Sequence, residues 1–167
     1  MLDVAHNPDA IQLLLSKLAT TTTTKIRMIV GLSSDKDVSQ CIPAIQTFLQ
    51  KHNSQMNGPY LHLVEAAHPR AAKIEDLITS CGTTKEYHVN LQDRSVTYQV
   101  QHALSLCEDN ELLVICGSVF LMAEAREALG IDEPKDSQYI SEVAGMNLRF
   151  GQENFANHKP TEPNTNK

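Results

Sequence analysis

Apolar side chains recur along the chain in two alternating patterns. The first, with apolar residues every three or four positions, covers residues 9–19, 37–50, 71–80, 96–107 and 119–129. The second, a short run of apolar residues, covers residues 26–32, 60–66, 87–91 and 112–116. The first spacing is typical of an amphipathic helix and the second of a buried strand. We therefore predict alternating strands and helices, preceded by a stub of a strand at Met1 and Leu2.

This order of elements predicts an α/β fold. Strands separated by helices long enough to cross back over a sheet favour a three-layer, Rossmann-like domain, with a mainly parallel sheet and helices on both faces. We expect five or six strands. Ligands bind beyond the carboxyl ends of the strands in such sheets, so the loops that follow the strands are where a site is expected.

Composition narrows the classes of function. The chain has 167 residues, enough for one ordinary domain, and its formal charge of -6 with 14 scattered Lys and Arg residues argues against nucleic acid as a partner. Its four cysteines form no C-x-x-C pair and no zinc site, and no long apolar run predicts a membrane span. We expect a cytoplasmic monomer, or a mitochondrial or plastid protein if a targeting segment precedes this sequence.

The loops after the expected strands are polar and lead into helices. They read Asp3-Val4-Ala5-His6-Asn7-Pro8, Gly31-Leu32-Ser33-Ser34-Asp35-Lys36-Asp37, His68-Pro69-Arg70-Ala71-Ala72 and Gly117-Ser118. Helix N-termini present free N–H groups and a partial positive charge, which favours carboxylates and phosphates. A small anionic ligand is therefore expected at these loops.

The strings LDVAHNP, GLSSDKD, HPRAA and CGSVFLMAEAR, in this order, resemble folylpolyglutamate and dihydrofolate synthases of the Mur ligase superfamily. The resemblance covers residues 1–130 and corresponds to the C-terminal domain of those enzymes, with the first strand truncated. Residues 131–157 would be a C-terminal extension of uncertain structure. Residues 158–167, polar and rich in proline, would be a disordered tail.

The resemblance implies an ATP-dependent acid–amino-acid ligase of folate biosynthesis and one-carbon metabolism. ATP would phosphorylate a folate carboxylate, and the amine of glutamate would displace phosphate to form an amide. The expected ligands are glutamate, folate, ATP and magnesium. The magnesium would be held mainly by an N-terminal ATPase domain, which would be the partner of this chain.

The resemblance also assigns residues. Asp3 is similar to a ligand of the nucleotide ribose, and Asn7 is a weaker nucleotide-binding candidate. His6 would contact the nucleotide and act in catalysis near the acyl phosphate. Lys36 would act in catalysis and bind the glutamate carboxylate, and Ser118 would hydrogen-bond the incoming glutamate. No residue is assigned to a metal.

Each of these residues also has a purely structural interpretation. Asp3, Asn7 and Ser118 stand before expected helices, where such side chains commonly cap the first turn. His6 could be a structural histidine, and Lys36 could be a solvated loop charge. We assign no role to Arg70.

The phosphate-binding loop G-x-x-x-x-G-K-[ST] does not occur in the 167 residues. We therefore expect the chain alone to be inactive and interpret it as part of a longer enzyme. Three hypotheses stay open: a ligase domain, a non-catalytic module that binds a nucleotide or an amino acid, and a fragment without activity. The pattern does not separate dihydrofolate synthase from polyglutamate-extending activity.

Overall fold

The computed structural model of the chain describes residues 1–20, 25–53, 59–83 and 86–131. Its helices are α1 (Pro8–Ala19), α2 (Val38–His52), α3 (Ile74–Ser80), α4 (Val96–Leu106) and α5 (Val119–Ala128). Its strands are β1 (Lys25–Val30), β2 (Leu61–Leu63), β3 (Tyr87–His88) and β4 (Glu111–Cys116). The extension and tail expected from residue 132 onward lie outside the described residues.

The four strands form one parallel sheet in the order β3-β2-β1-β4. The expected stub of a first strand is present as a single parallel bridge between Leu2 and Ile115, beside β4. The predicted α/β class is confirmed. The expectation of five or six strands is wrong for the described residues, because the Leu2 segment makes only that one bridge.

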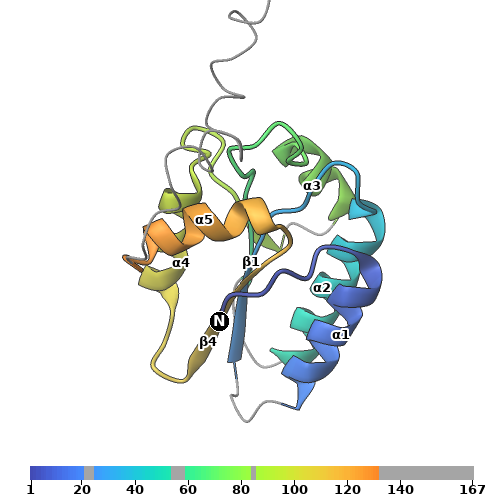
Figure 1. Ribbon diagram of the computed structural model, residues 1–167. Helices are drawn as coiled ribbons and strands as arrows, with labels where there is room; N and C mark the ends of the chain where they lie inside the picture. Colours follow the sequence, from blue (N-terminus) through green and yellow to red (C-terminus); the bar gives the residue numbers. More distant parts are fainter. Residues whose placement is uncertain (21–24, 54–58, 84–85, 132–167) are drawn as a thin grey trace, which may run out of the picture. The chain divides into compact units, whose positions relative to one another are not determined.

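Helices cover both faces of the sheet, with α1, α2 and α3 on one side and α4 and α5 on the other (Figure 1). Alternating side chains of the strands point to opposite faces. Met28 and Val30 therefore belong to the core under α1, α2 and α3, whereas Ile29 between them belongs to the core under α4 and α5. The sheet thus separates two apolar cores.

β2, β3 and α3 are shorter than their apolar patterns predict, and β3 covers only Tyr87–His88 of the expected residues 87–91. β2 stops at Leu63 although the run continues to Ala66, and α3 begins at Ile74 although the helical pattern begins at residue 71. The late start of α3 follows from the pairing of residues 71 and 72 with residues 32 and 33, just beyond β1. Ala71 forms an antiparallel bridge with Ser33, and the Ala72 amide donates to the Leu32 carbonyl. This segment is held extended, so the helix can start only after it.

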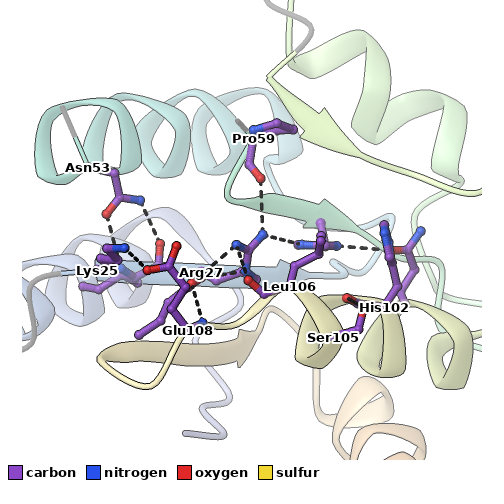
Figure 2. Close-up of polar contacts among 12 residues, drawn as sticks. Lys25, Arg27, Asn53, Pro59, His102, Ser105, Leu106 and Glu108 are labelled. Atoms are coloured by element: carbon purple, nitrogen blue, oxygen red, sulfur yellow. Dashed lines mark hydrogen bonds and ion pairs between the residues drawn. The ribbon is translucent and has the colours of Figure 1, made fainter. Parts of the chain in front are cut away.

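The amino half of the sheet contains a buried charge. The Arg27 side chain of β1 and the Glu111 side chain of β4 are both almost fully buried, and Arg27 Nε lies 2.6 Å from Glu111 Oε1 as an ion pair. The guanidinium also donates to the carbonyls of Pro59, at 3.4 Å, and Leu106, at 3.3 Å (Figure 2). It stacks over the Tyr60 ring at 4.9 Å. These contacts offset the cost of burying the two charges.

His62, in the middle of β2, is fully buried beside this pair. Its Nε2 lies 3.3 Å from Arg27 Nη1, and its Nδ1 lies 3.3 Å from Gln99 Oε1 of α4. A guanidinium has only donors, so Nε2 must accept and the proton of the neutral ring is on Nδ1. Burial first, and then the neighbouring His88 and Arg27 charges, lower the pKa of His62 to about 3.

A neutral buried histidine makes stability depend on pH. The pKa of His62 is lower in the folded chain than its ordinary value of 6.5, so the unfolded chain binds the extra proton. The part of the unfolding free energy that depends on neutral His62 is fully present above pH 6.5 and is lost as the pH falls toward 3. His62→Gln keeps a neutral donor and acceptor at this position. We expect urea titrations between pH 7 and 4.5 to show the wild-type free energy of unfolding falling more steeply, by about 1.4 kcal/mol per pH unit at the acid end. Parallel curves for the two proteins would contradict this assignment.

Candidate functional site at the carboxyl edge of the sheet

The ends of β1 and β4 meet without side chains between them. Gly31 follows β1 and Gly117 follows β4, and the Gly31 amide donates to the Cys116 carbonyl at 3.2 Å. A Cβ atom on Gly117 would lie 2.4 Å from the Gly31 carbonyl oxygen, and Gly117 has a φ of +120°. Only glycine fits there. The loops after β1 and β4 are consequently brought close together.

Two buried hydroxyl groups face each other just beyond these glycines. Ser33 Oγ lies 3.4 Å from Ser118 Oγ, and both residues are buried. Ser118 is also the N-cap of α5, because its Oγ accepts a hydrogen bond from the Phe120 amide at 3.2 Å. The capping interpretation of Ser118 is thus correct, and a binding role is compatible with it. Sequence reasoning did not single out Ser33, although it stands in the loop GLSSDKD directly after a strand.

The first loop lies beside the end of β4. The Asp3 amide donates to the Ile115 carbonyl at 3.0 Å, and Asp3 Oδ1 accepts from the Ala5 amide at 2.8 Å. The carboxylate is close enough to Cys116 to add to the effect of burial, which raises the pKa of that thiol to about 12. Asp3 therefore lies at the same edge as Ser118.

His6 and Asn7 follow in the same loop and are partly buried. His6 Nδ1 lies 2.7 Å from the Val4 carbonyl oxygen, so Nδ1 is the donor and Nε2 carries no proton in the neutral ring. Asn7 Oδ1 accepts from the Ala10 amide at 2.9 Å and caps α1. This cap is the structural role that the sequence offered as the alternative for Asn7.

The loop after β1 presents Lys36 at the start of α2. Lys36 Nζ lies 3.4 Å from Asp35 Oδ2, and Asp37 caps α2 by accepting from the Gln40 amide at 3.1 Å. An open hollow of about 640 Å³ lies here, lined by residues 34–39 and by residues of α3. Lys36 lines this hollow, whereas Ser118 does not. The predicted residues therefore share one edge of the sheet but do not form one compact cluster.

The loop after β2 contacts both the loop after β1 and helix α5, which follows β4. Arg70 Nη2 donates to Asp35 Oδ2 at 2.9 Å, and the Arg70 carbonyl accepts from the Ser34 amide at 2.8 Å. On its other side, the His68 ring stacks on Phe120 in the first turn of α5, with ring centroids 3.4 Å apart. The turn 68–70 thus touches both the Lys36 loop and the helix that Ser118 caps.

The first loop presents the Asp3 carboxylate as a hydrogen-bond acceptor. A carboxylate such as that of Asp3 can accept hydrogen bonds from the two ribose hydroxyls. Within the described ranges, no group of three His, Cys, Asp or Glu side chains is arranged to hold a metal ion.

The part of the chain that the structure describes has no helix long and apolar enough to cross a membrane.

Comparison with known proteins identifies the class of this domain. The family model of the Mur ligase, glutamate ligase domain matches residues 1–119, and the chain belongs to that family. The membership in the Mur ligase superfamily that the sequence motifs predicted is therefore confirmed. No curated protein sequence matches the chain significantly.

Solved structures of folate ligases share the fold. The chain is similar to Mycobacterium tuberculosis folylpolyglutamate synthase complexed with ADP and AMPPCP, with 22% identity, a TM-score of 0.62 and coverage of 79% of this chain and 30% of that one. It is also similar to the bifunctional Yersinia pestis folylpolyglutamate synthase/dihydrofolate synthase, with 24% identity, a TM-score of 0.57 and coverage of 77% of this chain and 28% of that one. A third similar structure is Escherichia coli FolC with DHPP and ADP, with 21% identity, a TM-score of 0.58 and coverage of 77% of this chain and 28% of that one. This chain spans less than a third of the length of these enzymes.

The contact between Gly31 and Gly117 can be tested by substitution. Gly117→Ala places a Cβ atom against the Gly31 carbonyl and strains a positive φ, whereas the control Gly82→Ala has a positive φ of +64° but nothing within 4 Å. We expect Gly82→Ala to cost about 1 kcal/mol of unfolding free energy and Gly117→Ala at least about 2 kcal/mol more. Urea denaturation measures both. Equal losses would show that the two loops do not need this close approach.

Proposed function

We propose that this chain is the glutamate-binding domain of an ATP-dependent ligase that adds glutamate to folates, and that it also contacts the ribose of ATP. The observation that carries the proposal is the common location of Asp3, Lys36 and Ser118. Lys36 and Ser118 follow the parallel strands β1 and β4, Asp3 follows the Leu2 bridge beside β4, and each precedes a helix at the same edge of the sheet. Members of this family would use that edge to bind an amino acid and to close on a nucleotide.

The chemistry at this edge suits an amino-acid carboxylate. Lys36 supplies an ammonium group, Ser118 a buried hydroxyl, and the first turns of α2 and α5 supply N–H groups. His6 would lie near the acyl phosphate and act in catalysis. Asp3 and Asn7 would face the nucleotide, although the Asn7 side chain is already engaged as a cap.

The ligands bound in similar structures support this choice. A bifunctional folylpolyglutamate synthase/dihydrofolate synthase was solved with Mn, AMPPNP and L-glutamate bound, and Escherichia coli FolC was solved with DHPP and ADP. We infer that glutamate, a folate and ATP are the ligands of the enzyme to which this domain belongs. A magnesium ion would be held mainly by an N-terminal ATPase domain, which would be the partner of this domain in the enzyme. The enzyme would act as a monomer in the cytoplasm.

Glutamate binding can be measured on the chain itself. We expect millimolar L-glutamate to shift the amide NMR signals of Lys36, Ser118 and their neighbours, and the signals of the amino edge of the sheet to stay unchanged. Ser118→Ala should weaken this binding about 10-fold or more, because a hydrogen bond to a charged group is lost. Ser105→Ala, a serine at the far end of α4, is the matched control. The proposal would be wrong if L-glutamate and D-glutamate caused the same shifts or if both variants behaved alike.

Turnover should require the rest of the enzyme. The 167-residue chain contains no phosphate-binding loop, so we expect no folate-dependent ATP hydrolysis from it alone. Fused to the Mycobacterium tuberculosis folylpolyglutamate synthase in place of the matched 30% of that chain, it should release ADP only when folate and glutamate are both present. Binding of L-glutamate without turnover in the fusion would favour the non-catalytic module. Folate-dependent ATP hydrolysis by the chain alone would contradict the expectation.

A further inference from the structure

Lys36 and Arg70 contact the same oxygen atom. Asp35 Oδ2 lies 3.4 Å from Lys36 Nζ and 2.9 Å from Arg70 Nη2. The guanidinium is the nearer cation. Asp35 is therefore shared between two positive groups, and the guanidinium is the one that it holds more closely.

Arg70 is held in place by its own loop. Its amide donates to His68 Nδ1 at 3.1 Å, and its carbonyl accepts from the Ser34 amide at 2.8 Å, next to Asp35. The stacking of His68 on Phe120 fixes the same turn against α5, and the Arg70 guanidinium lies 5.9 Å from the centre of the Phe120 ring. The position of Arg70 beside Asp35 is thus determined by backbone and ring contacts as well as by charge.

An unpaired Asp35 would interfere with substrate binding. Lys36 has one ammonium group, and a neighbouring carboxylate competes for it with the carboxylate of an incoming amino acid. With Arg70 present, Asp35 has another cation at shorter distance. Without Arg70, the only cation that the described structure places on Asp35 would be Lys36.

We propose that Arg70 is a positioning residue, whose guanidinium holds the Asp35 carboxylate and leaves the Lys36 ammonium available to the carboxylate of the incoming amino acid. This inference rests on the proposed function, because it assigns Lys36 to the amino acid. It gives a role in the site to a residue that the sequence motifs left unassigned.

Three variants test the inference by NMR titration of the chain with L-glutamate. Arg70→Gln should weaken binding about 2- to 5-fold, the effect of one exposed ion pair. Asp35→Asn should leave binding equal or tighter. The double variant Asp35→Asn/Arg70→Gln should bind like Asp35→Asn, because no carboxylate then competes for Lys36. Arg94→Gln is the matched control, since Arg94 is also exposed and pairs with Glu75 at 2.7 Å, and it should change nothing.

Each alternative role of Arg70 gives a different result. If Arg70 contacted glutamate directly, or served only to hold the loop, its loss would weaken binding by the same factor in the Asp35→Asn background, and the inference would be wrong. If wild type and Arg70→Gln bound L-glutamate equally, the inference alone would fail. If the wild-type chain did not bind L-glutamate at all, the proposed function would fail and the inference with it.

A measurement without ligand checks the charge arrangement separately. Partial desolvation raises the pKa of Asp35, but hydrogen bonds and charges from Arg70 and Lys36 outweigh it and hold that pKa below its ordinary value. Carboxyl ¹³C titration should show the pKa of Asp35 rising in Arg70→Gln while staying below that of an isolated aspartate, because Lys36 takes over the pair. An unchanged pKa of Asp35 would show that Arg70 does not hold this carboxylate.

Discussion

The close approach of Gly31 and Gly117 is the constraint on which the candidate site depends. β1 and β4 pair in parallel up to Val30 and Cys116, so the two glycines are the next residues along each strand. Any side chain on Gly117 would separate the two backbones. Because they touch, the Ser33 hydroxyl from one loop and the Ser118 hydroxyl from the other come within 3.4 Å of each other. The packing of β1 against β4 therefore brings these two hydroxyl groups together, because each serine stands just beyond the end of one of the two strands.

Near their amino ends, β1 and β4 are joined by an ion pair. Arg27 of β1 and Glu111 of β4 form a buried ion pair, and the guanidinium also reaches the last turn of α4 through the Leu106 carbonyl. Such a pair contributes little net stability compared with apolar residues, but losing one partner leaves an uncompensated buried charge. A slipped register of β1 against β4 would have the same effect. The network at the amino half thus favours the register that aligns Gly31 with Gly117 at the carboxyl edge.

The sequence predicted those parts of the structure that depend on local pattern. The alternation of apolar runs and helical spacing predicted the α/β class and the order of the elements, and the polar loops after the strands predicted the edge where the candidate residues lie. Contacts between distant segments could not be predicted. The start of α3 depends on Ala72 pairing with Leu32, and the environment of Arg70 depends on Asp35 and on the stacking of His68 and Phe120. Nothing in the spacing of single residues contains this information.

The assignment of individual residues was limited for a related reason. A side chain before a helix can cap it, bind a ligand or do both, and the sequence does not distinguish these roles. Asn7 uses its side-chain oxygen to cap α1. Ser118 uses its oxygen as an acceptor for the Phe120 amide, and its hydroxyl hydrogen is a separate donor, with Ser33 Oγ 3.4 Å away. Capping and binding are thus compatible for the serine, because a hydroxyl can donate and accept at once.

The charge at this edge finally indicates how ATP and glutamate would divide it. In the loops that follow Leu2, β1, β2 and β4, four carboxylates (Asp3, Asp35, Asp37 and Glu65) stand against three cations (Lys36, Arg70 and Lys73), while burial and the Arg70 charge lower the pKa of His68 and favour its neutral ring. A triphosphate needs a concentrated positive site, which the described residues do not supply here. A single carboxylate needs one cation and a few donors. Under the function proposed above, this edge would bind the glutamate and the uncharged ribose of the nucleotide, and the phosphates with their metal would be bound by other residues of the enzyme.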